Sequence, residues 1–455
     1  MNSTDVRAIG TLLRMLDSSI ELETVYPELH NPKSIIAKFV DNLLNDKYSS
    51  DDEAALHLYG TCEIPQSYRT LKYRVLERAL DSTLKIDVAS YGLSEYSAAQ
   101  LRQMQLHYTS ALLLRRGNRS VATSIAIKNI NKSREHDNTL SELLHSLVLL
   151  TSSSRSNSTA QFNQISVRIR DLIHRFSNEL ETEIFLDHIP LLDYSERSSI
   201  KKADVANEYL RIASAYLRDT PSHSLTLNVF RLTVAASMFE HDIDRLLNTC
   251  DSFQKYLEDN PKYHQPSRFG ELKLSRTYAL LQIRDIEKAV IESNDMLSYF
   301  KPSGYNFVLA IELRALVLIM SQNYDAFYSF LRQWHPSQSF VVESSFVHER
   351  LLLYGAYCFL LQSLGLLTGS DVFHAKFRLT TFLNSVPTLY EDKDESNFQC
   401  IVLSLSYSVY SADYDAVYNR TQSLRVYLCR YIRSNYHARD QLVIRAFTAL
   451  ANCSF

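Results

Sequence analysis

The chain has 455 residues, of which 45% are hydrophobic and 22% are charged, and its formal net charge is −3. This composition is typical of a folded globular protein and excludes global disorder. The slightly acidic charge excludes a general attraction to nucleic acid or to anionic membranes, so either role would need a local patch. The length excludes a single compact core, and two or three domains or an elongated repeat array are expected.

Glycine and proline are scarce. Nine Gly and ten Pro residues occur, roughly 2% of the chain each, against usual frequencies of about 7% and 5%. Sheet proteins need both residues for tight turns, and nucleotide-binding α/β folds need Gly between strand and helix. The scarcity therefore predicts an all-α fold, made of an N-terminal helical domain followed by a solenoid of α-α hairpins.

The chain shows no signal for export or membrane insertion. Its first residues lack a basic region followed by a continuous apolar core, and the longest apolar runs fall short of about 20 residues. The six cysteines are scattered without a Cys-x-x-Cys pair, which favours reduced thiols over disulfides or zinc. We expect a cytoplasmic protein with no membrane, metal or cofactor.

The first 90 residues are predicted to form a helical domain. Four helices are expected, at 4–16, 32–44, 51–59 and 65–86. Within 52–81, the helix that ends at Tyr59, the turn that begins at Gly60 and the helix that begins at Pro65 are typical of a helix-turn-helix.

The helix at 65–85 is rich in cations. Arg74, Arg78 and Lys85 are expected on one face. The opposite, apolar face would hold Leu71, Val75, Leu76, Ala79 and Leu84. Two interpretations remain open for this segment. The cations either form an ordinary solvated face that includes Glu77 and Asp81, or they contact DNA phosphates.

In the DNA-binding interpretation, the start of this helix would enter a groove of the duplex. Gln66, Arg69 and Thr70 would approach the base edges there.

Residues 91–220 are predicted to form a first helical-hairpin segment. The Ser-rich tract at 151–159 is the only low-complexity stretch and is expected to be a linker or mobile loop. A long amphipathic segment follows at 164–189.

Residues 221–455 contain a repeated pattern. A helix, a short polar break and a second helix recur, and the second helix opens on Asp or Asn, whose side chain can cap its free N–H groups. The openers are Asp242, Asp285, Asn323, Asp371 and Asp413, spaced 43, 38, 48 and 42 residues apart. One hairpin per 40 to 45 residues is typical of a helical solenoid.

A small residue follows several openers. Ala289, Ala326 and Ala416 are expected where the second helix crosses its partner closely. This pattern resembles the tetratricopeptide-repeat (TPR) superfamily, as does 110–127, with Gly117-Asn118 at the turn and Ala122 at the crossing. The resemblance covers roughly 95–130 and 225–455 and implies a divergent, TPR-like solenoid.

A second group of cations and rings lies in the predicted C-terminal helix pair at 423–445. Basic residues interleaved with tyrosines suit phosphates and exposed bases, or an acidic protein segment. The alternative is that the rings are core and the cations are solvated. The candidate binding residues are Arg425, Tyr427, Arg430, Tyr431 and Arg433.

The sequence contains no phosphate-binding Gly-rich loop, His-Glu-x-x-His, Gly-x-Ser-x-Gly or kinase signature. A solenoid offers long surfaces for partners, so we expect a non-enzymatic protein–protein interaction module: a scaffold, adaptor or sensor that binds a protein or peptide. The alternative is a nucleic-acid-binding regulator that uses the basic helix at 65–85, with the solenoid as its sensor. A third interpretation is a subunit of a larger assembly.

Overall fold

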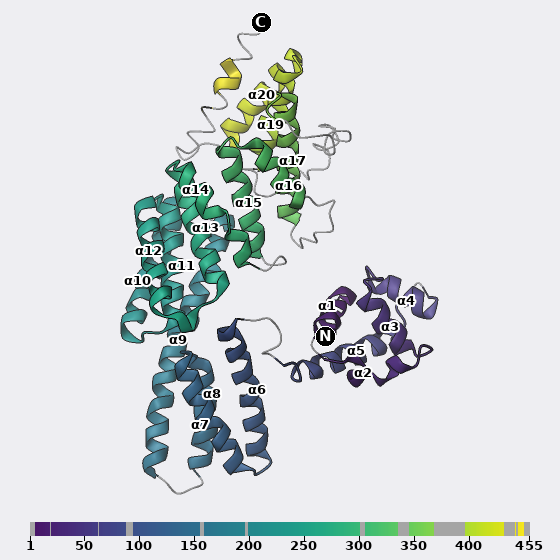
Figure 1. Cartoon of the computed structure of the whole chain (residues 1–455), viewed down its shortest axis with the longest axis vertical. Coiled ribbons are helices and arrows are strands. Elements are labelled where there is room, and N and C mark those ends of the chain that lie inside the picture. Colours follow the sequence, from purple (N-terminus) through teal and green to yellow (C-terminus); the bar gives the residue numbers. More distant parts are fainter. Residues whose placement is uncertain are drawn as a thin grey trace. The chain divides into compact units, whose positions relative to one another are not determined.

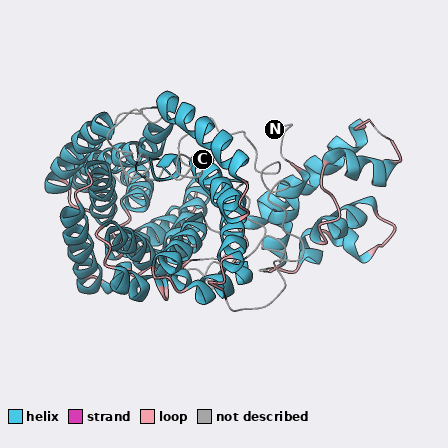
Figure 2. Ribbon diagram, turned by 90° about the horizontal axis from the view of Figure 1, so that it is seen from above, coloured by secondary structure: helices cyan, strands magenta, loops and turns pink. Residues whose placement is uncertain are grey.

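The computed structural model describes residues 5–18, 20–61, 63–87, 94–154, 159–195, 199–300, 305–334, 345–367, 396–431, 442 and 445–449. In these ranges every regular element is a helix, which confirms the all-α prediction (Figure 2). The chain divides into two compact units, residues 1–177 and 178–455. None of the described helices has both the length and the apolar character needed to cross a bilayer.

The first unit contains the N-terminal helices and the start of a hairpin series (Figure 1). Its elements are α1 (Val6–Asp17), α2 (Leu22–Val25), the 3-10 helix η1 (Pro27–His30), α3 (Ile35–Leu44), α4 (Asp51–Tyr59), α5 (Gln66–Thr83), α6 (Glu95–Arg115), α7 (Arg119–Glu135), α8 (Thr139–Ser153) and the first part of α9 (Thr159–Ser195).

The second unit continues with antiparallel helix pairs that pack in chain order (Figure 1). Neighbouring helices contact each other, and α13 also contacts α15, α15 contacts α17, and α17 contacts α19. The further elements are α10 (Ser199–Asp219), α11 (His223–Glu240), α12 (Ile243–Asp259), η2 (Pro261–Tyr263), α13 (Pro266–Gln282), α14 (Ile286–Ser293), η3 (Met296–Tyr299), α15 (Tyr305–Met320), α16 (Tyr324–Trp334), α17 (Ser345–Ser363), α19 (Ser396–Tyr410) and α20 (Tyr414–Tyr431).

A separate hydrophobic core holds α1 to α5 together. Its apolar side chains come from one face of α1, from α3 and from α5, and two tyrosines are fully buried among them. Each tyrosine hydroxyl has a partner: Tyr26 donates to the carbonyl of Val75 at 2.6 Å, and Tyr68 donates to the carboxylate of Asp51 at 2.6 Å. These bonds satisfy polar atoms that would otherwise be costly to bury, and they fix α5 against its neighbours.

The hairpin turns repeat one backbone conformation. The residue before the cap adopts a left-handed conformation, with φ between 53° and 85° at Gly117, Asp137, His241, Arg284, Gln322 and Ala412. The next N–H reaches back five residues, as from Asp242 to the carbonyl of Ser237 at 2.9 Å. This bond satisfies a carbonyl at the end of the first helix before the second helix begins.

The predicted caps are confirmed wherever the structure describes them. The openers Asp242, Asp285, Asn323 and Asp413 each accept a hydrogen bond from the N–H three residues later, at 3.0 to 3.3 Å. The fifth predicted opener, Asp371, lies outside the described residues.

The predicted crossing positions need a correction. Ala289 is fully buried as expected, but Ala326 and Ala416 are only half-buried, whereas the next residues, Phe327 and Val417, are buried. The reason is the register. Ala289 follows its cap by four residues and the other two alanines follow theirs by three, and one residue turns a helix by about 100°. The side chain four residues after the cap faces the neighbouring helix.

The Ser-rich tract is partly helical. Because α8 runs on to Ser153, the first residues of the predicted loop, 151–153, belong to that helix. The hydroxyl of Ser153 donates to the carbonyl of Leu150 at 2.9 Å, so this polar side chain finds its hydrogen-bond partner inside the helix. Residues 155–158 lie outside the described residues.

Candidate partner-binding site

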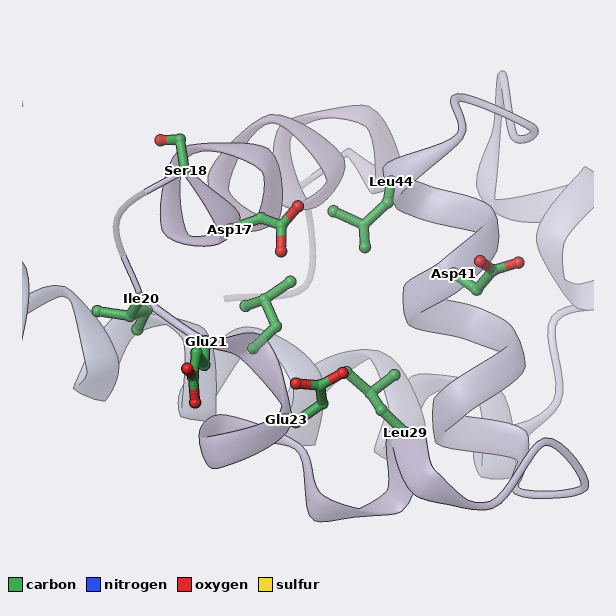
Figure 3. A pocket seen from close by; sticks show the side chains of 9 residues that line it. Asp17, Ser18, Ile20, Glu21, Glu23, Leu29, Asp41 and Leu44 are labelled. Carbon is green, nitrogen blue, oxygen red and sulfur yellow. The ribbon is translucent and has the colours of Figure 1, made fainter.

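A groove lies on the surface of the N-terminal helices, between the end of α1, the pair α2–η1 and α3 (Figure 3). Its volume is about 630 Å³. The lining combines apolar side chains that are buried or half-buried with exposed polar side chains, called here the rim. The apolar ones are Ile20, Leu22, Leu29 and Leu44, and the rim consists of Asp17, Ser18, Glu21, Glu23 and Asp41.

The groove forms where α1 ends and the chain turns toward α2. Asp17 is the last residue of α1, and the following turn is held by a bond from the N–H of Ile20 to the carbonyl of Leu16 at 2.8 Å. The short α2 then buries Leu22, and Pro27 opens η1. The chain thus turns twice in a few residues and leaves a hollow against α3.

The rim is negatively charged. Asp17, Glu21 and Glu23 are exposed, and no ion pair is formed by any of them within the described part of the chain. Asp41 has only a distant cation, Lys47 at 3.9 Å, with side chains more than half exposed on both sides. Charges beside a low-dielectric apolar surface act more strongly than charges in open water, so the groove favours a cationic ligand.

The three cations of the predicted basic face do not form one continuous face. Arg78 donates to both carboxylate oxygens of Glu28 at 2.8 and 2.9 Å, and this bond lowers the pKa of Glu28. Lys85 lies beyond the end of α5, so its position no longer follows the helical repeat. Arg74 is exposed on α5. The structure therefore leaves one of the three, Arg74, as an exposed cation within the helix.

The segment predicted as a helix-turn-helix contains the two helices α4 and α5. Gly60 ends α4 in the left-handed conformation at φ 70°, and Gln66, Arg69 and Thr70 are exposed at the start of α5. The six connecting residues, 60–65, make a longer connection than the three or four residues of a DNA-binding turn.

The predicted apolar face of α5 is confirmed except at one position. Leu71, Val75 and Ala79 are buried, and Leu76 is partly buried against the same core. Leu84 caps the end of the helix and is 51% exposed. The helix therefore ends before its last predicted core position.

The C-terminal candidates lie mostly outside the described residues. The backbone of Arg425, Tyr427, Arg430 and Tyr431 belongs to α20, but their side chains and all of Arg433 lie outside the described residues. Their binding role stays a prediction. Across the described residues, no group of three or more His, Cys, Asp or Glu side chains is arranged to hold a metal ion.

The groove was not predicted from the sequence because two of the elements that form its walls were not predicted. Neither α2 nor η1 is among the four helices predicted for the first 90 residues. The available signal was the buried pair Leu22 and Val25 followed by Pro27, a residue that favours the first turn of a helix.

Comparison of the chain with models of protein families, with curated proteins and with solved structures finds no match.

Proposed function

We propose that the chain is a protein-interaction module that binds a partner segment on surfaces of packed helices. The groove between α1, α2–η1 and α3 is the binding site that the geometry favours best. The ligand we propose is a peptide segment that carries lysine or arginine beside apolar side chains. The observation that carries the proposal is the combination, in one groove, of apolar side chains and three exposed carboxylates that form no ion pair with any described residue.

The dimensions of the groove fit this class of ligand. Peptides bind in concave sites in which apolar contacts are combined with polar or charged groups that set orientation. A volume of about 630 Å³ accommodates a few side chains rather than a folded domain. The half-buried Ile20 and Leu29 would bind the apolar side chains, and Asp17, Glu21 and Glu23 would attract the cations.

The TPR-like character of the remaining helices belongs to the same proposal. The capped hairpin turns and the packing of helices in chain order support it. Stacked hairpins of this kind offer further partner surfaces along the chain.

The nucleic-acid alternative receives less support from the described residues. Arg78 is already bonded to Glu28, and Lys72 of the same helix is bonded to Asp51 at 2.7 Å. A duplex would therefore have to break protein ion pairs to gain phosphate contacts. This alternative stays a prediction, and it requires a duplex affinity that falls when Arg74 is replaced.

The proposal is tested with two labelled synthetic peptides and the full chain. Both are amphipathic, with the same leucine face, and are flanked by Lys in one and by Gln in the other. We expect the Lys peptide to bind more tightly at low salt. The triple variant Asp17→Asn, Glu21→Gln, Glu23→Gln should weaken it by about tenfold, because each exposed pair contributes about 0.2–1 kcal/mol.

A matched control removes the same charge elsewhere in this domain. Asp52, Glu77 and Asp81 are exposed and lie outside the groove. The variant Asp52→Asn, Glu77→Gln, Asp81→Asn should leave the affinity within about twofold, since distant exposed charges are screened. Equal losses in the two triple variants would contradict a site in this groove.

A further inference from the structure

The helix α6 exposes a row of large apolar side chains. The residues that it buries are Tyr96, Gln103 and Ser110, whereas four large apolar side chains on the other side are exposed. These are Leu101, Met104, Tyr108 and Leu112, at 44%, 49%, 55% and 46% exposure. Their spacing of three, four and four residues places them in one line along the helix.

The buried side of α6 is held by mixed contacts. Asn138, the cap of α8, donates to the side-chain oxygen of Gln103 at 2.9 Å, and the hydroxyl of Ser110 is satisfied within α6 by the carbonyl of His107 at 2.9 Å. Leu113 and Leu114 pack against the apolar core between α7 and α8. The apolar line is left free for another contact.

Scattered exposed apolar residues are normal on a protein surface, but a continuous line marks an interaction site. A groove of about 380 Å³ runs beside this line, between α6 and α8. Ala111 and Leu114 contribute from α6, and Leu144, Leu147 and Val148 from α8. Leu147 is itself 42% exposed. The line and the groove lie on adjacent sides of α6 and are together called here the α6–α8 surface.

The charge beside this surface is positive. Arg115, at the end of α6, and Arg119, at the start of α7, line the groove and are exposed. Within the described part of the chain neither forms an ion pair, and no acidic residue is among the side chains that line the groove. The other groove, on α1 to α3, has the opposite charge.

We propose that the α6–α8 surface binds an amphipathic helix of a partner protein that carries carboxylates beside its apolar face. The apolar line of α6 would pack against the apolar face of that helix, and Arg115 and Arg119 would pair with its carboxylates. This mode of binding lays a helix into an apolar groove, with anchors at helical spacing. The inference rests on α6, α8 and the first residue of α7, and it is independent of the groove on α1 to α3.

The test uses the full chain and two labelled synthetic helices with one leucine face, flanked by Glu in one and by Gln in the other. Fluorescence anisotropy at low salt should give the Glu peptide about fivefold tighter binding, as expected for two partly exposed ion pairs. The variant Tyr108→Glu should weaken both peptides by about tenfold or more, since it places a charge in the apolar contact. The double variant Arg115→Ala, Arg119→Ala should abolish the preference for Glu and leave the Gln peptide unchanged.

The control is Ile291→Glu, which changes an isolated apolar side chain of α14 that is 71% exposed. Its affinity for both peptides should equal that of the wild type. Unchanged binding in Tyr108→Glu would overturn the proposal. So would a wild-type dimer that Tyr108→Glu converts to a monomer in sedimentation, because a second copy would then cover the surface. Leu80 is an exposed apolar side chain of α5, 52% exposed. Peptide binding that appears only after Leu80→Glu would overturn the proposal too, because α5 of the same chain would then cover the surface.

Discussion

Replacement of Glu142 should loosen the packing of α7, α8 and α9. This glutamate lies four residues after the cap Asn138, the position that is apolar in other hairpins, and its side chain is only 5% exposed. It accepts hydrogen bonds from Arg134 of α7 at 2.7 Å and from two nitrogens of Arg168 of α9 at 2.9 Å. Glu142→Gln removes the negative charge that holds both arginines.

The magnitude follows from the exposure of the partners. Breaking a fully buried ion pair costs about 3–5 kcal/mol, because the remaining charge stays buried. Arg134 and Arg168 are 53% and 39% exposed, so water can solvate them once the carboxylate is gone. We therefore expect a loss of about 2 kcal/mol for Glu142→Gln.

Hydrogen exchange of the intact chain measures this loss locally. The most protected amides of α8 should exchange about 30-fold faster in Glu142→Gln at neutral pH. The control is Glu208→Gln, which breaks an exposed pair with Arg211 at 2.7 Å and should leave protection unchanged.

The difference should also depend on pH. Burial alone raises the pKa of Glu142, but the hydrogen bonds from Arg168 and Arg134 outweigh it and hold the pKa below its usual range. A carboxyl whose pKa is lower in the folded state contributes its full stabilisation at a pH above its unfolded-state pKa of about 4.3. This stabilisation is lost as the pH falls through the folded-state pKa. The ratio of the α8 exchange rate in Glu142→Gln to that in the wild type should therefore approach one in acid. Wild-type protection in the variant at neutral pH, or a ratio that rises on acidification, would refute the reasoning.

Three further predictions concern the hairpins. Asn323→Ala should cost about 1 kcal/mol in a thermal melt and Asn323→Asp almost nothing, because only the side-chain acceptor matters; equal losses would contradict the cap. Ala289→Arg should cost about 2–4 kcal/mol by overpacking and Ala416→Arg clearly less, and the reverse order would contradict the register. Burial raises the pKa of the Cys250 thiol to about 12, so iodoacetamide at pH 8 should label it only after denaturation. Rapid labelling of the native chain would contradict the burial of Cys250.

The hairpin turns could be predicted from the sequence because their determinants are local. A side-chain acceptor at Asp242 or Asn323 needs only the N–H three residues later. The crossing residues were harder to predict. The choice between the third and the fourth position after the cap depends on the direction of the partner helix, and the small residue Ala326 indicated the wrong position.

The candidate site depends on contacts that are distant in sequence. Arg78 meets Glu28, 50 positions away, so the spacing of the cations within their helix could not reveal that one is already paired. The helix α2 has only four residues, too few to form without tertiary contacts. For α6, the spacing of Leu101, Met104 and Tyr108 predicts a line of side chains. It does not indicate whether that line faces the core or the solvent.

The most direct test of partner binding is a hydrogen-exchange comparison of the full chain with and without the Lys-flanked peptide. We predict that slower exchange is confined to the walls of the groove, the end of α1 with residues 20–30 and the last turn of α3. The triple variant Asp17→Asn, Glu21→Gln, Glu23→Gln should lose this protection at the same peptide concentration. Protection on α5 alone, or no protected segment at a concentration that saturates binding, would contradict the account.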